Sequence, residues 1–500
     1  MYNTEKLREF FPATTVYKDS AVMANFRSAA IPAFLRDWIV RRKAGPDGRI
    51  ADPAQLSDYV AAVIPRREER QQLEDEARTC GQTRKFLANI SVQFNSKANY
   101  YTFELADLGF THGRTIIEDY VWDRVKHELL GASGSWGLMR LGYMPPSDGK
   151  RNGRFTLLDY QSFCPYRVDL DLFRQARAHF TTEEWIDILL GAIDYNPDGY
   201  DGADGDAGPY EAWEAKHTML TRLLPFVEPR LNLVELAPKG TGKSYVFGKV
   251  CKYGWIVGGS GITRATLFYN KAKGQAGLIE VKDFIAMDEI QSVDFGSQRL
   301  EMQDAFKQYM EGGVIHFGPA TVKGDAGIIL LGNIDRRDMD IGTDMFRTLP
   351  PAFHESALLD RFHGFIQGSK IPRLTEKMTK LNTWALNTEY FTEIMHLLRS
   401  PSETLRYRAV VEELVQYPED ADKRDTDAVL RLCTAYLKLF FPHITGADAC
   451  GGPRFRQEFN QYCLRPARTM RGIIRKQLRI IDPAEFGGRD IATYRLRGIS

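Results

Sequence analysis

One short segment of this sequence carries glycine, lysine and serine at a spacing that binds phosphate groups. Residues 236–247 read LAPKGTGKSYVF, between a strand-like run, LNLVEL, and a helix-like run, KSYVFGKV. In such a turn the backbone N–H groups point at phosphate oxygens, a lysine reaches the β- and γ-phosphates, and a hydroxyl binds Mg²⁺. The residues expected to bind the nucleotide are Gly240, Thr241, Gly242, Lys243 and Ser244, with Ser244 on the metal.

Alanine stands where this motif has its first glycine. The spacing G-x-x-x-x-G-K-[ST] places a glycine at position 237, and the sequence has Ala237 there. Alanine does not adopt positive φ angles as freely as glycine, so the start of the loop must follow backbone angles open to an L-residue. An ordinary β–α turn is the alternative for this motif taken alone.

A second motif supplies two carboxylates at the end of an apolar run. Residues 283–290 read DFIAMDEI, which is typical of a buried strand followed by acids. Asp288 is placed to hold the Mg²⁺ shell, and Glu289 to polarise an attacking water and accept its proton. The order of the two motifs favours a nucleotide hydrolase over a chance match.

Two further polar residues follow or precede apolar runs. Asn333 lies at the end of a third strand-like run, IILLGN, and can bind the γ-phosphate or orient the water, because parallel strands bring their carboxyl ends to one crevice. Arg361, in ALLDRFHGFI, can stabilise charge on the nucleotide of a neighbouring subunit, which requires an oligomer. The alternatives are a turn-forming asparagine and a salt bridge between Arg361 and Asp360. We therefore expect Glu289, Asn333 and Arg361 to be catalytic.

The elements that must position these residues indicate an α/β fold. From residue 217 to about 370, short apolar runs alternate with helical stretches, which predicts a parallel sheet. Alternating strands around one helix near residues 85–165 predict a small β-rich module, and a barrel of the oligonucleotide-binding type is one β fold that fits. The predicted domains are an N-terminal helical region (1–84), the β-rich module (85–178), an α/β core (179–375), and a helical lid with a short basic tail (376–500).

Two local patterns mark the start of the α/β core. Thr181 and Glu184 have the spacing of a capping box, which satisfies free N–H groups at the start of a helix. The following stretch, NPDGYDGADGDAG, predicts an exposed loop. A calcium loop is disfavoured because no glutamate closes the required spacing.

The bulk properties limit the class of protein. The 500 residues suit about two to four domains, and the net charge of +1 predicts no general affinity for nucleic acid. From Arg465 to the end, however, the sequence has nine basic residues and three acids. Such a segment can bind phosphates or an acidic partner, or it can be a solvated helix face. Six cysteines without a C-x-x-C pair argue against zinc and disulfides. No apolar run suits a membrane helix or a signal peptide, so we expect a cytoplasmic protein.

The order of the motifs resembles that of AAA+ ATPases. APKGTGKS, IAMDEI, LLGN and LLDRF are followed by a helical region that carries arginines. The segments FTTEEWIDILL, LPFVEPRLNLVELAPKGTGKSYVF and MEGGVIHF more closely resemble the Lon-related BrxL family of BREX phage-defence proteins. The resemblance covers about residues 180–365 and is weaker across the lid. That family commonly has glycine at the position of Ala237.

The resemblance implies a ring-forming ATPase, a hexamer or double hexamer, that uses ATP and Mg²⁺. It further implies an N-terminal region that binds double-stranded DNA, and other defence-system proteins as partners. In the lid it implies a second sensor, either Arg468 or Arg471, that closes over the nucleotide of its own or a neighbouring subunit. Members of the family usually continue into a Lon-like peptidase domain, whereas this sequence stops shortly after the lid, so we expect no proteolytic activity.

A predicted hairpin offers a contact for the substrate. Residues 312–327 read GGVIHFGPATVKGDAG, with Gly318 and Pro319 as turn residues. Lys323 is the candidate DNA contact, and the alternative is an exposed lysine that is merely solvated.

Three functions fit this sequence. The first is a motor whose ATP hydrolysis is stimulated by DNA. The second is an AAA+ machine that remodels or unfolds a polypeptide, for which the hairpin offers the aromatic Phe317. The third is a scaffold that uses ATP as a slow switch, which the intact pair of Asp288 and Glu289 disfavours.

Overall fold

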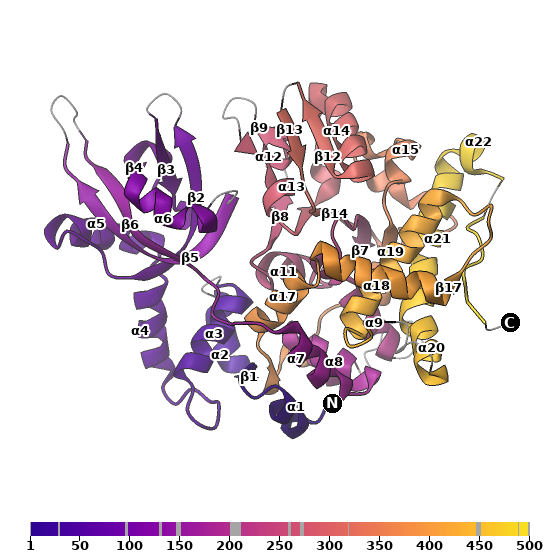
Figure 1. Cartoon of the computed structure of the whole chain (residues 1–500), viewed down its shortest axis with the longest axis horizontal. Helices are drawn as coiled ribbons and strands as arrows, with labels where there is room; N and C mark the ends of the chain where they lie inside the picture. The colour runs from indigo at the N-terminus through magenta and orange to yellow at the C-terminus, as the bar shows by residue number, and fades with distance from the viewer. Residues whose placement is uncertain are drawn as a thin grey trace. The chain divides into compact units, whose positions relative to one another are not determined.

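In the computed structural model, the chain folds into two compact units (Figure 1). One unit comprises Met1–Trp38 and Val168–Ser500, and the other comprises Ile39–Arg167. The predicted boundary at residue 84 does not coincide with this division. The structure describes residues 2–28, 31–95, 99–129, 133–146, 152–200, 212–258, 262–270, 275–318, 320–446, 452–488 and 490–498.

The first residues of the chain belong to the larger unit because a short strand pairs with a distant one. β1 (Thr15–Lys18) is antiparallel to β16 (Thr383–Leu386). This pairing has no local signal in the sequence, which is why helical periodicity alone groups residues 1–84 together. The helices around β1 are α1 (Thr4–Phe10), α2 (Ser20–Ser28) and α3 (Ala33–Lys43), and α3 crosses the division between the units.

The smaller unit contains a five-stranded sheet with the order β3-β2-β5-β6-β4. All neighbouring strands are antiparallel except β4 and β6, which are parallel. An isolated bridge between Tyr101, in β3, and Ile117, directly after β4, joins the two ends of this order. The elements are α4 (Pro53–Val63), α5 (Arg70–Thr79), β2 (Phe86–Asn95), β3 (Tyr100–Glu104), β4 (Thr115–Ile116), α6 (Asp119–Leu129), β5 (Ser133–Met144) and β6 (Arg154–Ser162).

The larger unit is built around a five-stranded parallel sheet with the order β15-β7-β14-β11-β8. Buried apolar side chains line β7, β11 and β14, as their sequences predict. The strands are β7 (Leu233–Ala237), β8 (Gly254–Gly258), β11 (Phe284–Asp288), β14 (Gly327–Asn333) and β15 (Gly364–Gln367). The α/β class with a parallel sheet is therefore confirmed for this unit.

Helices accompany this sheet before, between and after its strands. Those up to β15 are α7 (Leu170–Ala178), α8 (Thr182–Ala192), α9 (Ala212–Thr221), α10 (Leu224–Val227), α11 (Lys243–Lys249), α12 (Arg264–Leu267), α13 (Leu278–Val281), α14 (Arg299–Gly312) and α15 (Ser356–Leu359). Those after it are α16 (Glu376–Thr379), α17 (Thr388–Leu397), α18 (Pro401–Leu414), α19 (Lys423–Phe440), α20 (Pro453–Phe459), α21 (Arg465–Ile481) and α22 (Pro483–Phe486).

Three short strand pairs complete the larger unit. They are β9 (Tyr269–Asn270) with β10 (Gln275–Ala276), β12 (Val314–Phe317) with β13 (Ala320–Lys323), and β17 (Val415–Gln416) with β18 (Arg495–Leu496). The β12–β13 pair is the hairpin predicted within residues 312–327. The predicted capping box also forms, since Thr181 and Glu184 each accept the other's backbone N–H.

Some predictions fall on residues that the structure does not describe. These are residues 201–208, which form most of the acidic, glycine-rich loop, together with Pro319, Cys450 and Arg489. Within the described ranges, none of the helices combines the length and the apolar character that crossing a bilayer requires.

Candidate nucleotide site

The phosphate loop begins where β7 ends, and Ala237 is the last residue of that strand. Gly240 and Gly242 have positive φ angles of 82° and 81°, whereas Ala237 is extended, as its side chain requires. Gly368, directly after β15, packs on the alanine, and a Cβ at Gly368 would lie 2.1 Å from Ala237 Cβ. Alanine therefore fits at position 237 because the residue packed against it, Gly368, has no side chain.

Lys243 and Asn333 meet beside the loop. The parallel pairing of β14 with β7 places Asn333 opposite Ala237. Lys243 Nζ donates to Asn333 Oδ1 at 3.0 Å and to the carbonyl oxygens of Ala237 and Pro238, each at 3.3 Å. Burial lowers the pKa of Lys243, and these three partners are neutral. A phosphate oxygen would supply the negative charge that they lack.

Ser244 and Asp288 form the second contact of the site. Ser244 Oγ donates to Asp288 Oδ2 at 2.6 Å, so a hydroxyl and a carboxylate oxygen lie together. Oxygen atoms are the ligands that Mg²⁺ prefers, and the pair therefore fits this metal. Glu289 follows, exposed and in left-handed backbone conformation with φ at 50°. Glutamate rarely adopts such angles, and residues that do so cluster at functional sites.

A buried ion pair that the sequence analysis missed braces the loop. Arg222 and Glu235 are fully buried, and the two guanidinium–carboxylate hydrogen bonds measure 2.6 and 3.0 Å. Arg222 also donates to the Thr241 carbonyl at 2.6 Å and to its hydroxyl at 3.1 Å. The Thr241 side chain therefore holds the loop in place. The sequence does contain a signal for this ion pair. Glu235 lies within the apolar, strand-like run LNLVEL, and a buried acid requires a cation as its partner.

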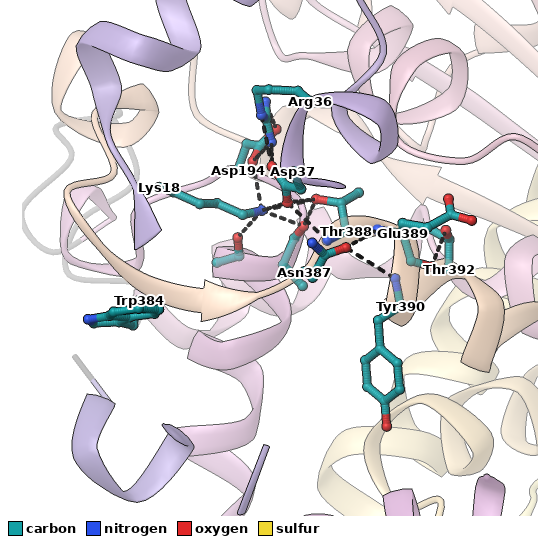
Figure 2. A network of polar contacts seen from close by, with 12 residues as sticks. Lys18, Arg36, Asp37, Asp194, Trp384, Asn387, Thr388, Glu389, Tyr390 and Thr392 are labelled. Carbon is teal, nitrogen blue, oxygen red and sulfur yellow. Dashed lines mark hydrogen bonds and ion pairs between the residues drawn. The ribbon is translucent and has the colours of Figure 1, made fainter. Parts of the chain in front are cut away.

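A polar network holds the helix that follows the loop, and Figure 2 shows its charged residues. The Tyr245 hydroxyl, in α11, donates to Asp194. Asp194 also accepts from Lys18 Nζ and Arg36 Nη1, each at 2.8 Å, and Asp37 pairs with the same two cations. Burial alone would raise the pKa of Asp194, but the two cations hold it well below its usual range. Sequence reasoning missed this network because its members come from distant segments.

A pocket opens beside the carboxyl end of β15, the strand next to β7. It therefore lies toward the same edge of the sheet as the phosphate loop. His217 in its wall bonds through Nε2 to the Tyr462 carbonyl at 2.9 Å, and burial lowers the pKa of His217 to about 4. The lining residues include Trp213, His217, Gln367, Lys370, Arg465 and Thr469.

Arg361 lies at the opposite edge of the sheet. It precedes β15, so it lies at the amino ends of the parallel strands, and a strand as long as β7 spans about 16 Å. Its guanidinium pairs with Glu311 at 2.8 Å. The salt bridge expected as an alternative does not form, because the Asp360 carboxylate pairs with Arg424 and Arg471.

The two lid arginines have different surroundings. Arg471 is fully buried, pairs with Asp360 and Asp425 at 2.6 Å each, and donates to the Phe362 carbonyl just before β15. It therefore lies at the amino edge of the sheet, away from a nucleotide at the phosphate loop of its own subunit. Arg468 is half-buried and directly precedes Thr469, which lines the pocket. The second sensor, Arg468 or Arg471, therefore stays a prediction.

The predicted basic end is partly neutralised by acids of α19 and its cap. Arg475 pairs with Asp425 at 2.5 Å and with Asp422 at 3.4 Å. Arg471 is buried in ion pairs as well. Because the charges of Arg471 and Arg475 are balanced inside the protein, less positive charge remains at this end of the chain for phosphates or an acidic partner.

Lys323 lies at the base of the hairpin, opposite Val314 in the register and away from the turn at Gly318. Its side chain is exposed. It shares the wall of a pocket with basic and acidic residues, among them Arg230, Lys282, Glu280, Asp283 and Asp325. The DNA contact at Lys323 stays a prediction.

A parallel sheet, a glycine-rich loop after β7, and the contacts of Lys243 and Ser244 at its carboxyl edge are the features of a P-loop ATPase core. Comparison with known families gives a closer assignment. Residues 155–492 match the family described as "Lon-like protease BrxL-like, ATPase domain". Residues 9–143 match "BREX system Lon protease-like protein BrxL N-terminal". The chain therefore belongs to the BrxL family.

Two curated relatives are similar along nearly the whole chain. "Lon-like protease BrxL" of Escherichia coli O9:H4 (strain HS) is 26% identical over 485 residues, which are 96% of this chain and 65% of that protein. "Lon-like protease BrxL" of Bacillus cereus (strain H3081.97) is 25% identical over 491 residues, which are 96% of this chain and 67% of that protein. The chain thus spans about two thirds of the length of these relatives.

Proposed function

We propose that this protein is a ring-forming, ATP-dependent motor that binds double-stranded DNA and translocates on it in BREX-type defence against phage. The main support for the proposal is a pair of hydrogen bonds at the carboxyl edge of one parallel sheet. Lys243 bonds to Asn333 there, and Ser244 bonds to Asp288. The defence role is inferred from the family, whose description names the BREX system.

The residues of the site would divide the work of hydrolysis between them. Lys243 and the backbone of residues 240–242 would bind the phosphates, and Ser244 and Asp288 would hold Mg²⁺. When bound, Mg²⁺ supplies positive charge that stabilises the negative charge developing on the transferred phosphoryl group. The exposed Glu289 would accept a proton from the attacking water, and Asn333 would orient that water.

The position of Arg361 supports an oligomer. From the amino edge of the sheet this arginine does not reach the nucleotide of its own subunit. In a head-to-tail ring, the amino edge of one subunit faces the nucleotide of the next, where an arginine can stabilise transition-state charge. Its partner Glu311 is exposed, so the ion pair can exchange for a phosphate.

The smaller unit supports nucleic-acid binding. Its strand order, the parallel β4–β6 pair, and a helix between β4 and β5 fit a small closed barrel, from which we infer the oligonucleotide-binding type. Phe94 at the end of β2 is 40% exposed, and Arg154 lies 4.8 Å above the Tyr100 ring. Exposed aromatic rings and arginines are the groups on which bases stack.

The hairpin gives less support to a protein-remodelling machine. Such a machine would need an accessible aromatic at the hairpin, yet Phe317 is buried. Its ring stacks on Tyr269, and the Arg264 guanidinium lies over it at 5.2 Å. We therefore keep remodelling of a polypeptide as the second candidate function.

Two substitutions test the ATP site in the purified full chain. Lys243→Ala is expected to lower the affinity for fluorescent ATP by about 100-fold or more, because the phosphates lose their buried cation. Glu289→Gln is expected to keep that affinity and to lower turnover on the order of 10²-fold or more, because only the proton acceptor is lost.

Lys249→Ala, in the last turn of the same helix, is the matched control and should leave both measurements unchanged. Phosphate release at the wild-type rate in Lys243→Ala or Glu289→Gln would contradict the assignment of this site.

A further inference from the structure

The chain segment that follows β15 returns to the phosphate loop. The Leu374 N–H donates to the Gly240 carbonyl at 3.0 Å. The Leu374 side chain also approaches the second glycine of the loop, since its Cδ1 would lie 3.0 Å from a Cβ at Gly242. This segment is therefore fastened to both glycines that shape the loop.

Arg373, one residue earlier, lies directly against the loop. A Cβ at Gly240 would be 3.3 Å from Arg373 Nε and 3.4 Å from its Cγ, so the whole side chain runs past the glycine. The side chain is exposed, and it forms no hydrogen bond or ion pair with another described residue. A guanidinium whose charge no described acid balances thus lies beside the loop.

Three other arginines, Arg222, Arg361 and Arg471, differ in this respect. Each of them pairs with a carboxylate, at 2.6 to 2.8 Å. Their charges are satisfied inside the protein, whereas Arg373 retains its donors for a ligand. A guanidinium is a planar donor that suits the oxygens of a phosphate group.

We infer that Arg373 is a phosphate-binding residue that contacts the phosphate chain of a nucleoside di- or triphosphate in its own subunit. The inference rests on the proposed ATP site and adds a second cation to it. Lys243 would approach the phosphates from the start of α11, and Arg373 from the segment after β15. Because Gly240 has no side chain, the guanidinium can lie close to the loop backbone.

Nucleotide titrations of the full chain test this role. Arg373→Ala is expected to weaken the binding of fluorescent ADP and ATP about 10-fold, and Arg373→Lys should restore part of the loss because the charge is kept. The dependence of log Kd on log salt should also become shallower in Arg373→Ala, because fewer charges interact. Melting without nucleotide should not change, since the side chain is exposed.

Lys377→Ala is the matched control, because it removes an exposed cation four residues further along the same segment. Equal affinities of wild type and Arg373→Ala, in a protein that binds ATP, would overturn the inference and leave the ATP site intact. A lower melting temperature without nucleotide, with no rescue by lysine, would assign Arg373 a structural role and also overturn it. Failure of the wild type to bind ATP would instead overturn the proposed function.

Discussion

Lys243, Ser244, Asp288 and Asn333 are found together because a parallel sheet brings the ends of β7, β11 and β14 to one edge. These residues could be predicted because each directly follows an apolar run or lies in a motif of fixed spacing. Arg222, Tyr245 and Arg373 could not be predicted in the same way, since the groups they contact lie in other segments of the chain.

Arg361 gives the clearest prediction at the scale of single residues. Arg361→Ala is expected to lower turnover on the order of 10²-fold or more and to keep ATP affinity, because the arginine acts on a neighbouring subunit. Mixing Arg361→Ala with Lys243→Ala subunits should restore turnover to about a quarter of the wild-type value, since about that share of subunit contacts would combine an intact loop with an intact arginine.

Phosphate release and light scattering measure the mixture, with each variant alone as the control. If the mixture stays as inactive as its components although rings form, Arg361 does not act between subunits.

At the scale of elements, the junction of β7 with the loop depends on a small residue in the neighbouring segment. Gly368→Ala would place two methyl groups at an impossible 2.1 Å, so we expect a loss of stability of about 1 to 3 kcal/mol and weaker ATP binding. Adding Ala237→Gly should recover only part of the loss, because the new methyl would still meet the Leu236 carbonyl at 2.7 Å. Melting curves and ATP titration of the two single variants and the double variant measure this coupling.

Gly312→Ala is the control for adding a methyl group, since nothing lies within 4 Å of a Cβ at that position. Strictly additive effects of Ala237→Gly and Gly368→Ala would show that the two residues do not interact.

The pocket beside β15 predicts a pH dependence of stability. Burial lowers the pKa of His217 from 6.5 to about 4, so the folded larger unit favours the neutral ring. The neutral ring therefore adds to the free energy of unfolding above about pH 6.5. As the pH falls toward 4, this stabilisation is lost, by up to about 3 kcal/mol. His217→Gln should make the melting temperature less dependent on pH across this range, and an unchanged pH profile would contradict the assignment.

Elements were predicted best where their signal is local. The apolar runs of β7, β11 and β14 and the capping box of α8 lie where the sequence indicates. The pairing of β1 with β16 was not predictable, because strand partners this distant are chosen by packing and not by the strand's own residues. The same reason explains why the predicted N-terminal helical region is divided between the two units.

At the scale of the whole molecule, one helix belongs to both units. Arg36 and Asp37 of α3 lie in the network that includes Asp194, the partner of Tyr245 in the helix of the phosphate loop. The same helix continues from Ile39 into the smaller unit. The division between the two units therefore falls inside one helix, whose first part contributes to the network beside the phosphate loop.

The rate of ATP hydrolysis with and without duplex DNA tests the central claim most directly. We predict that DNA raises turnover several-fold, that added salt weakens this stimulation because phosphate contacts are screened, and that Glu289→Gln stays inactive with DNA present. Equal rates with and without DNA, together with stimulation by an unfolded protein, would contradict the account and favour a machine that acts on polypeptides.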